Sequence, residues 1–189
     1  MEERMGELRS RTIDDFLREL ASASATPGGG SVAALSGAIA SDLGSMVCRL
    51  TLKRAPTDQL KDLLARFVSL EGEFLELAEA DESAFSAVME AYGIDRSDES
   101  RASRIASALL EATRVPQRVA ELGIDLLQDL CTLAPLGSKQ SVSDAGVAAH
   151  LATAAVRSAL LNVRINLAYM RDRAMVEEME KAACALDDQ

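Results

Sequence analysis

The sequence predicts one all-α domain over residues 1–189, a single bundle of long helices. Hydrophobic residues make up 48% of the chain, with 11 Gly and 4 Pro, which excludes a disordered, collagenous or low-complexity chain. Aromatic residues are 3% and Trp is absent, so the residues that strands prefer are scarce and an all-β sandwich is excluded. Apolar residues recur instead in steps of three and four, the spacing of amphipathic helices.

The first two helices lie on either side of a cluster of helix-breaking residues. A short helix begins after Thr12, a favourable N-cap, and ends before residues 25–30. A second helix runs from Ser31 to about Leu52. It has a stripe of large apolar residues and a separate face of small residues, which lets another helix approach closely. The stripe is Val32, Leu35, Ile39, Leu43, Met46 and Leu50, and the small face is Ala33, Gly37, Ala40, Gly44 and Cys48.

Turn signals divide the rest of the chain into four further helices. Their predicted ranges are residues 58–92, 100–133, 143–169 or 170, and 174–185. Gly93 ends the first of these helices, and Pro116 kinks or divides the second. Helices this long with alanine-rich faces carry apolar surface that one small bundle does not bury, so we expect the chain to form a homodimer.

Charge and cysteine content limit the partners and the cellular compartment that we expect for this chain. The net charge is −10 and no basic run is present, which disfavours a nucleic-acid partner. Three widely separated cysteines and one histidine show no metal-ligand spacing, so we expect free thiols in a reducing compartment and no metal site. The first ten residues are charged and no uncharged apolar run is long enough to cross a bilayer, so we expect a cytoplasmic protein with no membrane partner.

The motif from Pro27 to Ser31 opens the second helix and is a candidate binding site. Gly28, Gly29 and Gly30 permit backbone conformations closed to other residues and a close approach to a ligand. The amides at the start of the helix would bind an anionic or polar group. The spacing is neither that of a P-loop nor that of a dinucleotide-binding motif. The alternative is a flexible turn, which this motif taken alone slightly favours.

Asp81 is the strongest candidate for proton transfer. It falls on an apolar stripe of the third helix, where a carboxylate is unfavourable unless it is paired, protonated or lining a cavity. Burial would raise its pKa and suit it to acid–base chemistry. The alternative, to which we give equal weight, is a structural Asp paired with an Arg or a backbone amide. Glu71 lies on the same stripe, so the pattern does not single out one residue.

The last long helix carries Asp144, Asn162 and Asn166 on one face, with Ser143 just before Asp144. Polar groups therefore lie at both ends of a narrow strip of small residues. The two asparagines are one turn apart and would offer amide donors and acceptors to a heterocycle. The alternative for Asp144 is that an acidic residue in a first helical turn only interacts with the helix dipole.

Six short motifs follow one another along the chain, and taken together in this order they are specific. The motifs are residues 24–31 (SATPGGGS), 44–51 (GSMVCRLT), 81–89 (DESAFSAVM), 112–116 (ATRVP), 143–149 (SDAGVAA) and 162–166 (NVRIN). Through them, most of the chain resembles the methenyltetrahydrofolate cyclohydrolase and formimidoyltetrahydrofolate cyclodeaminase family.

This resemblance implies an all-helical homodimer acting on a tetrahydrofolate one-carbon carrier, with no metal and no permanently bound cofactor. Water attack on the amidinium carbon of the methenyl form gives the 10-formyl compound, whereas the formimidoyl form closes a ring and expels ammonia. Both reactions need proton transfers, for which the resemblance implies Asp81 and Asp144 as catalytic residues. The substrate-binding residues implied are Pro27, Gly28, Gly29, Gly30, Ser31, Lys53, Ser143, Asn162 and Asn166.

The sequence departs from the family's usual pattern beside several of these motifs. The departures are Arg49, residues 52–56, residues 94–96 and Ser138. Lys53, Arg54 and Arg96 nevertheless keep positive charge that an anionic glutamyl tail would use. The departures leave open an alternative function, a non-catalytic folate-binding or scaffold relative with the same fold. A plain helical dimerisation module is a third hypothesis, which the ordered motifs disfavour.

Overall fold

The regular structure is entirely helical. The computed structural model describes residues 8–138 and 140–187, and within these ranges it contains helices and no strand, which confirms the all-α prediction. The elements are η1 (Leu8–Ser10), α1 (Ile13–Leu20), α2 (Gly29–Leu52), α3 (Asp58–Gly93), α4 (Arg101–Leu133), α5 (Val142–Tyr169) and α6 (Arg173–Asp187).

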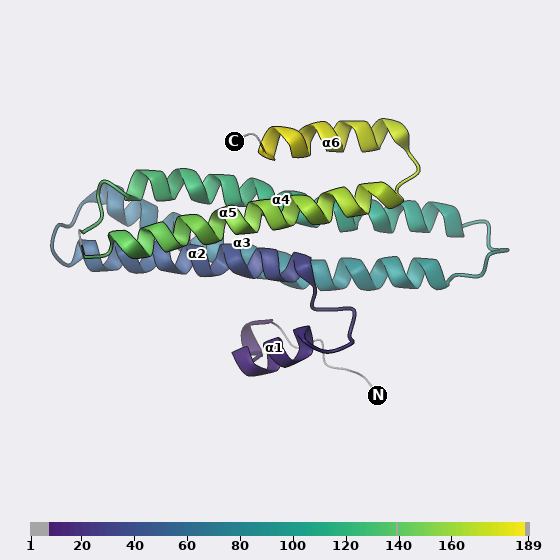
Figure 1. The fold of residues 1–189 in the computed structure, drawn as a ribbon, viewed down its shortest axis with the longest axis horizontal. Helices are drawn as coiled ribbons and strands as arrows, with labels where there is room; N and C mark the ends of the chain where they lie inside the picture. The colour runs from purple at the N-terminus through teal and green to yellow at the C-terminus, as the bar shows by residue number, and fades with distance from the viewer. Residues whose placement is uncertain (1–7, 139, 188–189) are drawn as a thin grey trace.

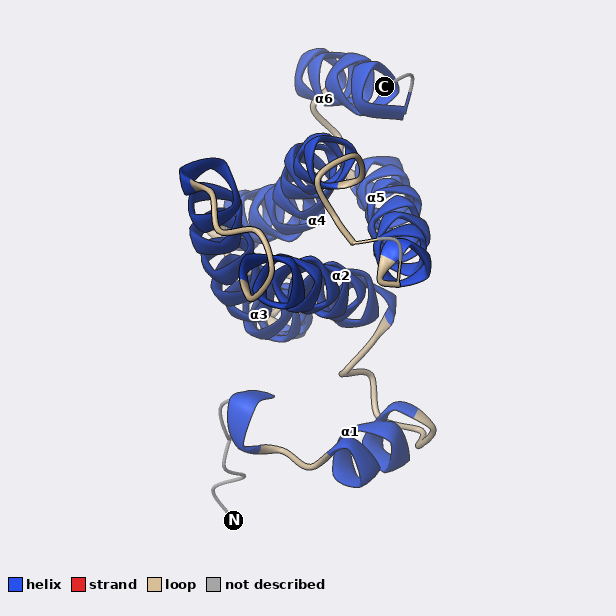
Figure 2. Cartoon of the chain, turned by 90° about the vertical axis from the view of Figure 1, so that its left-hand side faces the viewer, coloured by secondary structure: helices blue, strands red, loops and turns tan. Residues whose placement is uncertain are grey.

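Helices α2, α3, α4 and α5 form the bundle, whose long axis is horizontal in Figure 1. Each packs against the next in the chain, and α5 returns to α2, so the four helices enclose one hydrophobic core. Helix α6 lies outside, against α4 and α5, and α1 lies on the opposite side, away from the bundle (Figures 1 and 2). Phe16 of α1 is buried, whereas Ile13 and Leu17 are exposed.

Three glycines of α2 receive three side chains of α3, and both sets are spaced by seven residues. The pairs are Gly44 with Phe67, Gly37 with Phe74, and Gly30 with Asp81. A Cβ built at Gly37 would lie 2.5 Å from the ring of Phe74, which is fully buried and has no room to move. The small-residue face predicted for this helix is therefore the face on which α3 packs.

The predicted helix boundaries mostly agree with the structure to within two residues. Thr12 and Thr57 cap α1 and α3 by accepting hydrogen bonds from backbone amides three residues later. Helix α2 begins at Gly29, two residues before the predicted Ser31. No described glycine has a positive φ, so the expectation that the glycine run uses conformations closed to other residues is wrong. What this run supplies is close approach, as the Gly30–Asp81 pair shows.

Helix α4 continues through Pro116, so of the two predicted outcomes, a kink or a division, the division does not occur. Proline lacks an N–H, and inside a helix it leaves the carbonyl four residues earlier without its usual donor. That carbonyl belongs to Ala112, and a side chain of α5 supplies the missing hydrogen bond. The lost helical bond is thus replaced by a tertiary one, and the helix is not interrupted.

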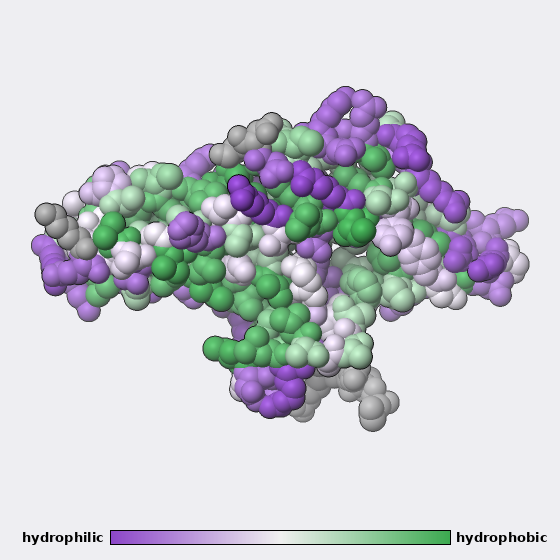
Figure 3. Space-filling view, in the orientation of Figure 1, coloured by the Kyte–Doolittle hydropathy of each residue, from purple (hydrophilic) through white to green (hydrophobic). Residues whose placement is uncertain are grey.

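One face of α5 carries a mostly apolar stripe whose members are exposed or only partly buried within the described chain. Its members are Val147, Leu151, Ala154, Ser158, Leu161, Ile165 and Ala168, spaced alternately by four and three residues. Leu161 is 63% exposed and Ile165 is 53% exposed. On α2, Ile39 and Leu50 of the predicted stripe are exposed as well. Hydrophobic residues gather over both helices on the face seen in Figure 3.

By length and composition alone, α2 and α5 are long and apolar enough to cross a membrane. The core helix of a soluble protein meets the same criterion, and in α2 the most apolar stretch is 61% buried by the bundle. In α5 the corresponding stretch is only 39% buried. Much of the apolar surface of α5 is therefore left for something outside this chain to cover.

Candidate functional site

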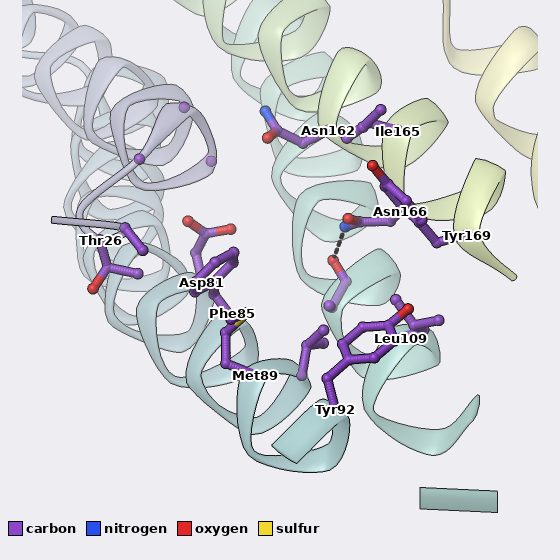
Figure 4. A pocket seen from close by; sticks show the side chains of 16 residues that line it. Thr26, Asp81, Phe85, Met89, Tyr92, Leu109, Asn162, Ile165, Asn166 and Tyr169 are labelled. Carbon is purple, nitrogen blue, oxygen red and sulfur yellow. Dashed lines mark hydrogen bonds between the residues drawn. The ribbon is translucent and has the colours of Figure 1, made fainter. Parts of the chain in front are cut away.

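A cavity of about 460 Å³ opens where α2 begins (Figure 4). Gly30 near the start of α2 faces Asp81, whereas α3 continues past Asp81 to Gly93, a further distance of about 18 Å. The cavity fills the space that a longer α2 would occupy between α3, α4 and α5. It is lined by Ala25, Thr26, Gly28, Gly29, Gly30, Asp81, Phe85, Val88, Met89, Tyr92, Leu109, Ala112, Asn162, Ile165, Asn166 and Tyr169.

Asp81 lies against the first turn of α2. A Cβ at Gly30 would lie 2.1 Å from Asp81 Oδ1, so only glycine allows the carboxylate this position. The hydroxyl of the fully buried Ser31 donates a hydrogen bond of 2.9 Å to Asp81 Oδ2. The N-terminus of α2 also directs the positive end of its dipole toward the carboxylate. Gly30 and Ser31 therefore belong to the site through Asp81, and the motif is more than a turn.

Opposing effects act on the charge of Asp81. Burial raises the pKa of Asp81 above its ordinary value, because the charged form loses water, while hydrogen bonds from the hydroxyl and amide of Ser31 favour the charged form. In the described part of the chain no ion pair involves Asp81, so the alternative of a structural Asp paired with an arginine does not apply. The other form of that alternative, pairing with a backbone amide, is present, because the Ser31 amide donates to the carboxylate. The carboxylate is thus half-buried, held by one serine and open to a cavity, which suits proton transfer.

Other acidic residues of α3 are paired with the N-terminal segment instead. Glu82 forms an ion pair with Arg11 at 3.0 Å, and Glu71 forms one with Arg9 at 3.4 Å. Glu71 shares the stripe of Asp81 but does not line the cavity. Asp81 and Glu71, which the sequence pattern did not distinguish, therefore have different surroundings in the structure.

Asp129 of α4 is a second buried carboxylate, which the sequence analysis did not single out. It is 4% exposed, and Arg66 of α3 binds both of its oxygens at 2.8 and 2.9 Å. Burial raises the pKa of Asp129, and the charge of Arg66 opposes that rise. Asp129 lines none of the cavities described here and has a cationic partner, the arrangement of a structural ion pair.

Asn162 and Asn166 project into the cavity from α5, as their shared face predicted. The Asn162 side-chain amide donates to the Ser158 carbonyl at 2.9 Å. The Asn166 amide donates at 2.6 Å to the Ala112 carbonyl, the group that Pro116 leaves without a helical donor (Figure 4). Each amide is fixed by one donor hydrogen, which leaves its carbonyl oxygen available to a ligand.

Aromatic and apolar side chains make up most of the remaining lining. Both tyrosines of the chain, Tyr92 and Tyr169, lie here, with Phe85 and Met89 of α3. In the sequence both tyrosines stand only at the predicted ends of helices, and they were not identified as cavity residues. One feature of the sequence could have identified them: the chain has two tyrosines and no tryptophan, and both tyrosines stand at the ends of long helices.

Three predicted site residues lie at the opposite end of the bundle. Lys53 follows the last residue of α2, and Ser143 and Asp144 lie in the first turn of α5. A hydrogen bond between Arg54 and Gln140 ties these two turns together. Asp144 and Asn162 are 18 residues apart on one helix, about 27 Å. Asp144 and the asparagines therefore lie at the two ends of the strip, as the sequence predicted, and do not form one cluster within a chain.

The described residues offer no ready metal site. Within residues 8–138 and 140–187, no group of three His, Cys, Asp or Glu side chains is placed to hold a metal ion. The chemistry visible in the cavity is that of one carboxylate, a serine hydroxyl, two amides and the first amides of α2.

Comparison with known proteins gives consistent matches over nearly the whole chain. Residues 12–185 match the formiminotransferase-cyclodeaminase family. The chain is 41% identical over 183 residues to methenyltetrahydrofolate cyclohydrolase of Methylorubrum extorquens, covering 91% of this chain and 86% of the other. It is 35% identical over 179 residues to formimidoyltransferase-cyclodeaminase of Mus musculus, of which it spans 33%. The crystal structure of formiminotetrahydrofolate cyclodeaminase from Thermotoga maritima superposes with a TM-score of 0.88 at 30% identity, covering 96% of this chain and 91% of that one.

Proposed function

The chain belongs to the formiminotransferase-cyclodeaminase family, and from this premise we propose that it is an enzyme of one-carbon folate metabolism, a methenyltetrahydrofolate cyclohydrolase. The relative with that name is 41% identical and matches over most of its own length, which favours hydrolysis. The single observation that carries the proposal is the position of Asp81, a carboxylate opposite the first turn of α2 and open to the cavity.

In the proposed reaction, the ionised Asp81 takes a proton from a water molecule as the water oxygen attacks the amidinium carbon. The resulting tetrahedral carbon bears one hydroxyl and two ring nitrogens. Asp81 returns its proton to N5 as the bond from carbon to N5 breaks, and the hydroxyl proton leaves to solvent, which gives the 10-formyl compound. A carboxylate whose pKa is raised by burial is a stronger base than a solvated one, which suits this step.

A second candidate is the cyclodeaminase reaction, favoured by the structural match to the Thermotoga maritima enzyme. There N10 of the formimidoyl substrate attacks the formimidoyl carbon. The ring closes at this step and N10 loses its proton. The former imine nitrogen takes up two protons and leaves as ammonia, which converts the ring carbon to the methenyl amidinium. Protonated Asp81 is placed to donate one of these protons. Hydrolysis and deamination thus require the same carboxylate in opposite starting states.

We assign the orientation of the pteridine ring to Asn162 and Asn166, whose free amide oxygens accept hydrogen bonds from ring N–H groups. The first turn of α2, from Gly28 to Ser31, forms the wall beside the reacting carbon. Pro27 is buried directly before this turn and fixes its approach. The proposal needs no resident cofactor or metal, because the folate carries the reacting group. A cytoplasmic setting is part of the proposal and accords with free Cys48, Cys131 and Cys184.

One absorbance measurement distinguishes the two reactions. Methenyltetrahydrofolate absorbs in the near ultraviolet, so hydrolysis makes this absorbance fall and cyclodeamination makes it rise. We expect the purified protein to accelerate the fall well above a buffer blank when it is given the methenyl compound. A rise with the formimidoyl compound alone would support the second candidate. Folate binding without either change would contradict both and favour the scaffold alternative.

We further propose that the active form is a homodimer that buries the exposed stripes of α5 and α2. Ala154 belongs to the α5 stripe, lies near the middle of α5, and is as far from Asp144 as from Arg164. A two-fold axis near Ala154, with the α5 helices antiparallel, would bring Asp144 of the partner subunit level with the asparagines of this chain. Ser143 and Lys53 of the partner subunit would approach the same region. This arrangement accounts for predicted site residues at both ends of the bundle.

The dimer is tested by placing a charge in the stripe. Leu161→Glu puts a carboxylate in the middle of the buried face, so we expect a monomer in sedimentation at micromolar concentration and reduced turnover. Val68→Glu, at a 47% exposed position on α3 outside the stripe, is the matched control and should remain dimeric and active. A parent protein that sediments as a monomer, or a Leu161→Glu variant that is dimeric and fully active, would contradict the proposal.

A further inference from the structure

The segment that precedes α2 forms one wall of the cavity that contains Asp81. This segment, residues 8–28, comprises η1, α1 and the turn that leads into α2, and is named here the N-terminal arm. Ala25, Thr26 and Gly28 of the arm line the cavity, and Figure 4 shows Thr26 on the same side of it as Asp81. Helix α1 itself lies away from the bundle (Figure 2). The position of this wall therefore depends on what holds the arm in place.

The beginning of the arm is held against α3 by carboxylates of that helix. The backbone amide of Leu8 donates to the carboxylate of Glu79, and Arg9 forms an ion pair with Glu71 at 3.4 Å. Both contacts come from η1, which packs on α3. They fix where the arm starts, but they lie before α1 and do not reach the part of the arm that lines the cavity.

Arg11 connects α3 to the far end of α1. Its guanidinium group donates to both oxygens of Glu82, at 3.2 and 3.0 Å, and to the carboxylate of Glu19 at 3.2 Å. The side chains of Arg11 and Glu82 are only 17% and 12% exposed, so their forked pair is screened less than a surface pair. Glu19 lies one residue before the end of α1, so Arg11 fixes the point from which the turn toward α2 departs.

Glu82 follows Asp81 directly in α3, so neighbouring residues of one helix hold the arm and carry the chemistry. The carboxylate of Asp81 faces Ser31 and the cavity, whereas that of Glu82 faces the arm. Neither Glu82 nor Arg11 lines the cavity. Helix α3 thus determines how far the wall formed by the arm lies from Asp81, and it does so through the ion pair.

We propose that Arg11 and Glu82 are positioning residues for substrate binding, because their ion pair holds the N-terminal arm where residues 25–28 complete the cavity beside Asp81. The inference rests on the proposed function and deepens it. Without the pair, the arm stays attached at η1 and at the start of α2, and the wall between them moves. The substrate must then order the arm as it binds, which lowers its affinity. Once bound, it meets the same Asp81, so the loss falls on KM and not on kcat.

The test uses two variants that break the pair and change the net charge in opposite directions. Arg11→Met and Glu82→Gln should each raise KM for methenyltetrahydrofolate about fivefold, with kcat and the acid limb of kcat/KM unchanged. The double variant should be no worse than either single one. Arg9→Met is the matched control, because it removes the same charge from an exposed pair of the same arm, and it should keep the KM of the parent.

Three results would overturn the proposal. KM changes of opposite sign in Arg11→Met and Glu82→Gln would show that their charges act directly on the anionic substrate. Additive increases in the double variant would show that the two residues act separately. Lower thermal stability with the KM of the parent would show that the pair only stabilises the fold.

Limited proteolysis separates this inference from the proposed function. Arg18 of α1 is exposed, so trypsin cleavage after Arg18 reports the order of the arm without any turnover. We expect faster cleavage in Arg11→Met and Glu82→Gln than in the parent and Arg9→Met, and protection of the parent by 5-formyltetrahydrofolate, which lacks the methenyl bridge. If this pattern appears but the parent turns over no folate, the positioning role stands and the proposed reaction fails. If the parent turns over folate but Arg18 is cleaved equally in all four proteins, the positioning role fails alone.

Discussion

The seam between α2 and α3 repeats one packing arrangement three times and uses it for two purposes. At Gly44 and Gly37 of α2, α3 inserts a phenylalanine ring, and both rings are fully buried. At Gly30, one heptad nearer the start of α2, the inserted side chain is the carboxylate of Asp81. In both regions a glycine is required because the inserted group reaches the α2 backbone.

The two regions differ in what surrounds the inserted group. Phe74 is enclosed by helices on every side, so it can only contribute packing. Asp81 occupies the last position of the series, where α2 begins, and therefore meets Ser31, helix amides and an open cavity. A core position thus becomes a chemical site because one of the surrounding helices starts there. The predictions below test that distinction.

The largest expected effect is that of Asp81→Asn, which keeps the shape and removes the ionisable group. A general acid or base contributes about 10²–10⁴-fold in rate, so turnover of methenyltetrahydrofolate should fall by about that factor. Stability should not fall at neutral pH, because the variant removes a desolvated charge. Turnover and thermal unfolding check both expectations. A variant that turns over like the parent would make Asp81 structural and leave Asp144 as the next candidate.

The second prediction makes the same substitution, glycine to alanine, in each of the two regions and compares the effects. In Gly30→Ala the new Cβ would overlap the carboxylate of Asp81, which can turn toward the cavity, so the protein should fold and lose turnover about 10²-fold through misplacement. In Gly37→Ala the new Cβ would overlap the enclosed ring of Phe74, which should lower the free energy of unfolding by about 1–3 kcal/mol.

The folded Gly37→Ala protein should keep the kcat of the parent, since Phe74 contacts no ligand. Chemical denaturation and turnover at a temperature where both variants are folded measure the two effects. The distinction between the regions would be lost if Gly37→Ala reduced kcat as much as Gly30→Ala.

The sequence predicted the helices and the angular position of each candidate residue well. Caps such as Thr57 and the stripe containing Asp81 follow from local rules that tertiary structure did not override. What the sequence does not give is where each helix begins relative to its neighbours. Asp81 lines a cavity because α2 begins opposite it, and periodicity along α3 contains no information about that.

The seven-residue spacing that α2 and α3 share is present in the sequence, but it can be interpreted only once the two helices are known to pack together. Glycines at 30, 37 and 44 and the residues at 67, 74 and 81 are each spaced by seven. Only when the helices are known to be antiparallel neighbours does Asp81 fall opposite Gly30. That Pro116 would not divide α4 could not be predicted for a related reason, since its lost hydrogen bond is replaced from α5 rather than within α4.

The third prediction tests that replacement. In Pro116→Ala the new backbone N–H would compete with Asn166 for the Ala112 carbonyl, so Asn166 would lose its fixed orientation in the cavity. Loss of one such hydrogen bond should raise KM about 3- to 10-fold and leave kcat largely unchanged. Asn166→Ala should have a similar effect, and the double variant should be no worse than either single one. Additive increases in KM would show that Pro116 and Asn166 act separately.

The smallest expected effect is a shift in pH dependence in Ser31→Ala. The Ser31 hydroxyl donates to the charged carboxylate of Asp81 and so lowers its pKa, against the rise caused by burial. Without the hydroxyl the pKa rises further, and the acid limb of kcat/KM for hydrolysis should move to higher pH. Ser41→Ala is the matched control, because this buried serine of the same helix donates to the Gly37 carbonyl and is remote from Asp81.

Stability should change with the same sign. Because burial raises the folded-state pKa of Asp81 above its ordinary value of 3.8, this group contributes stability that is fully present below pH 3.8 and is lost as the pH rises through the folded-state pKa. Ser31→Ala raises that pKa further, so its unfolding free energy should fall more than that of the parent between acidic and neutral pH. In the Asp81→Asn background this added pH dependence should vanish. If Ser31→Ala moved neither the acid limb nor the pH dependence of unfolding, Ser31 would only pack against Asp81 and would not set its charge.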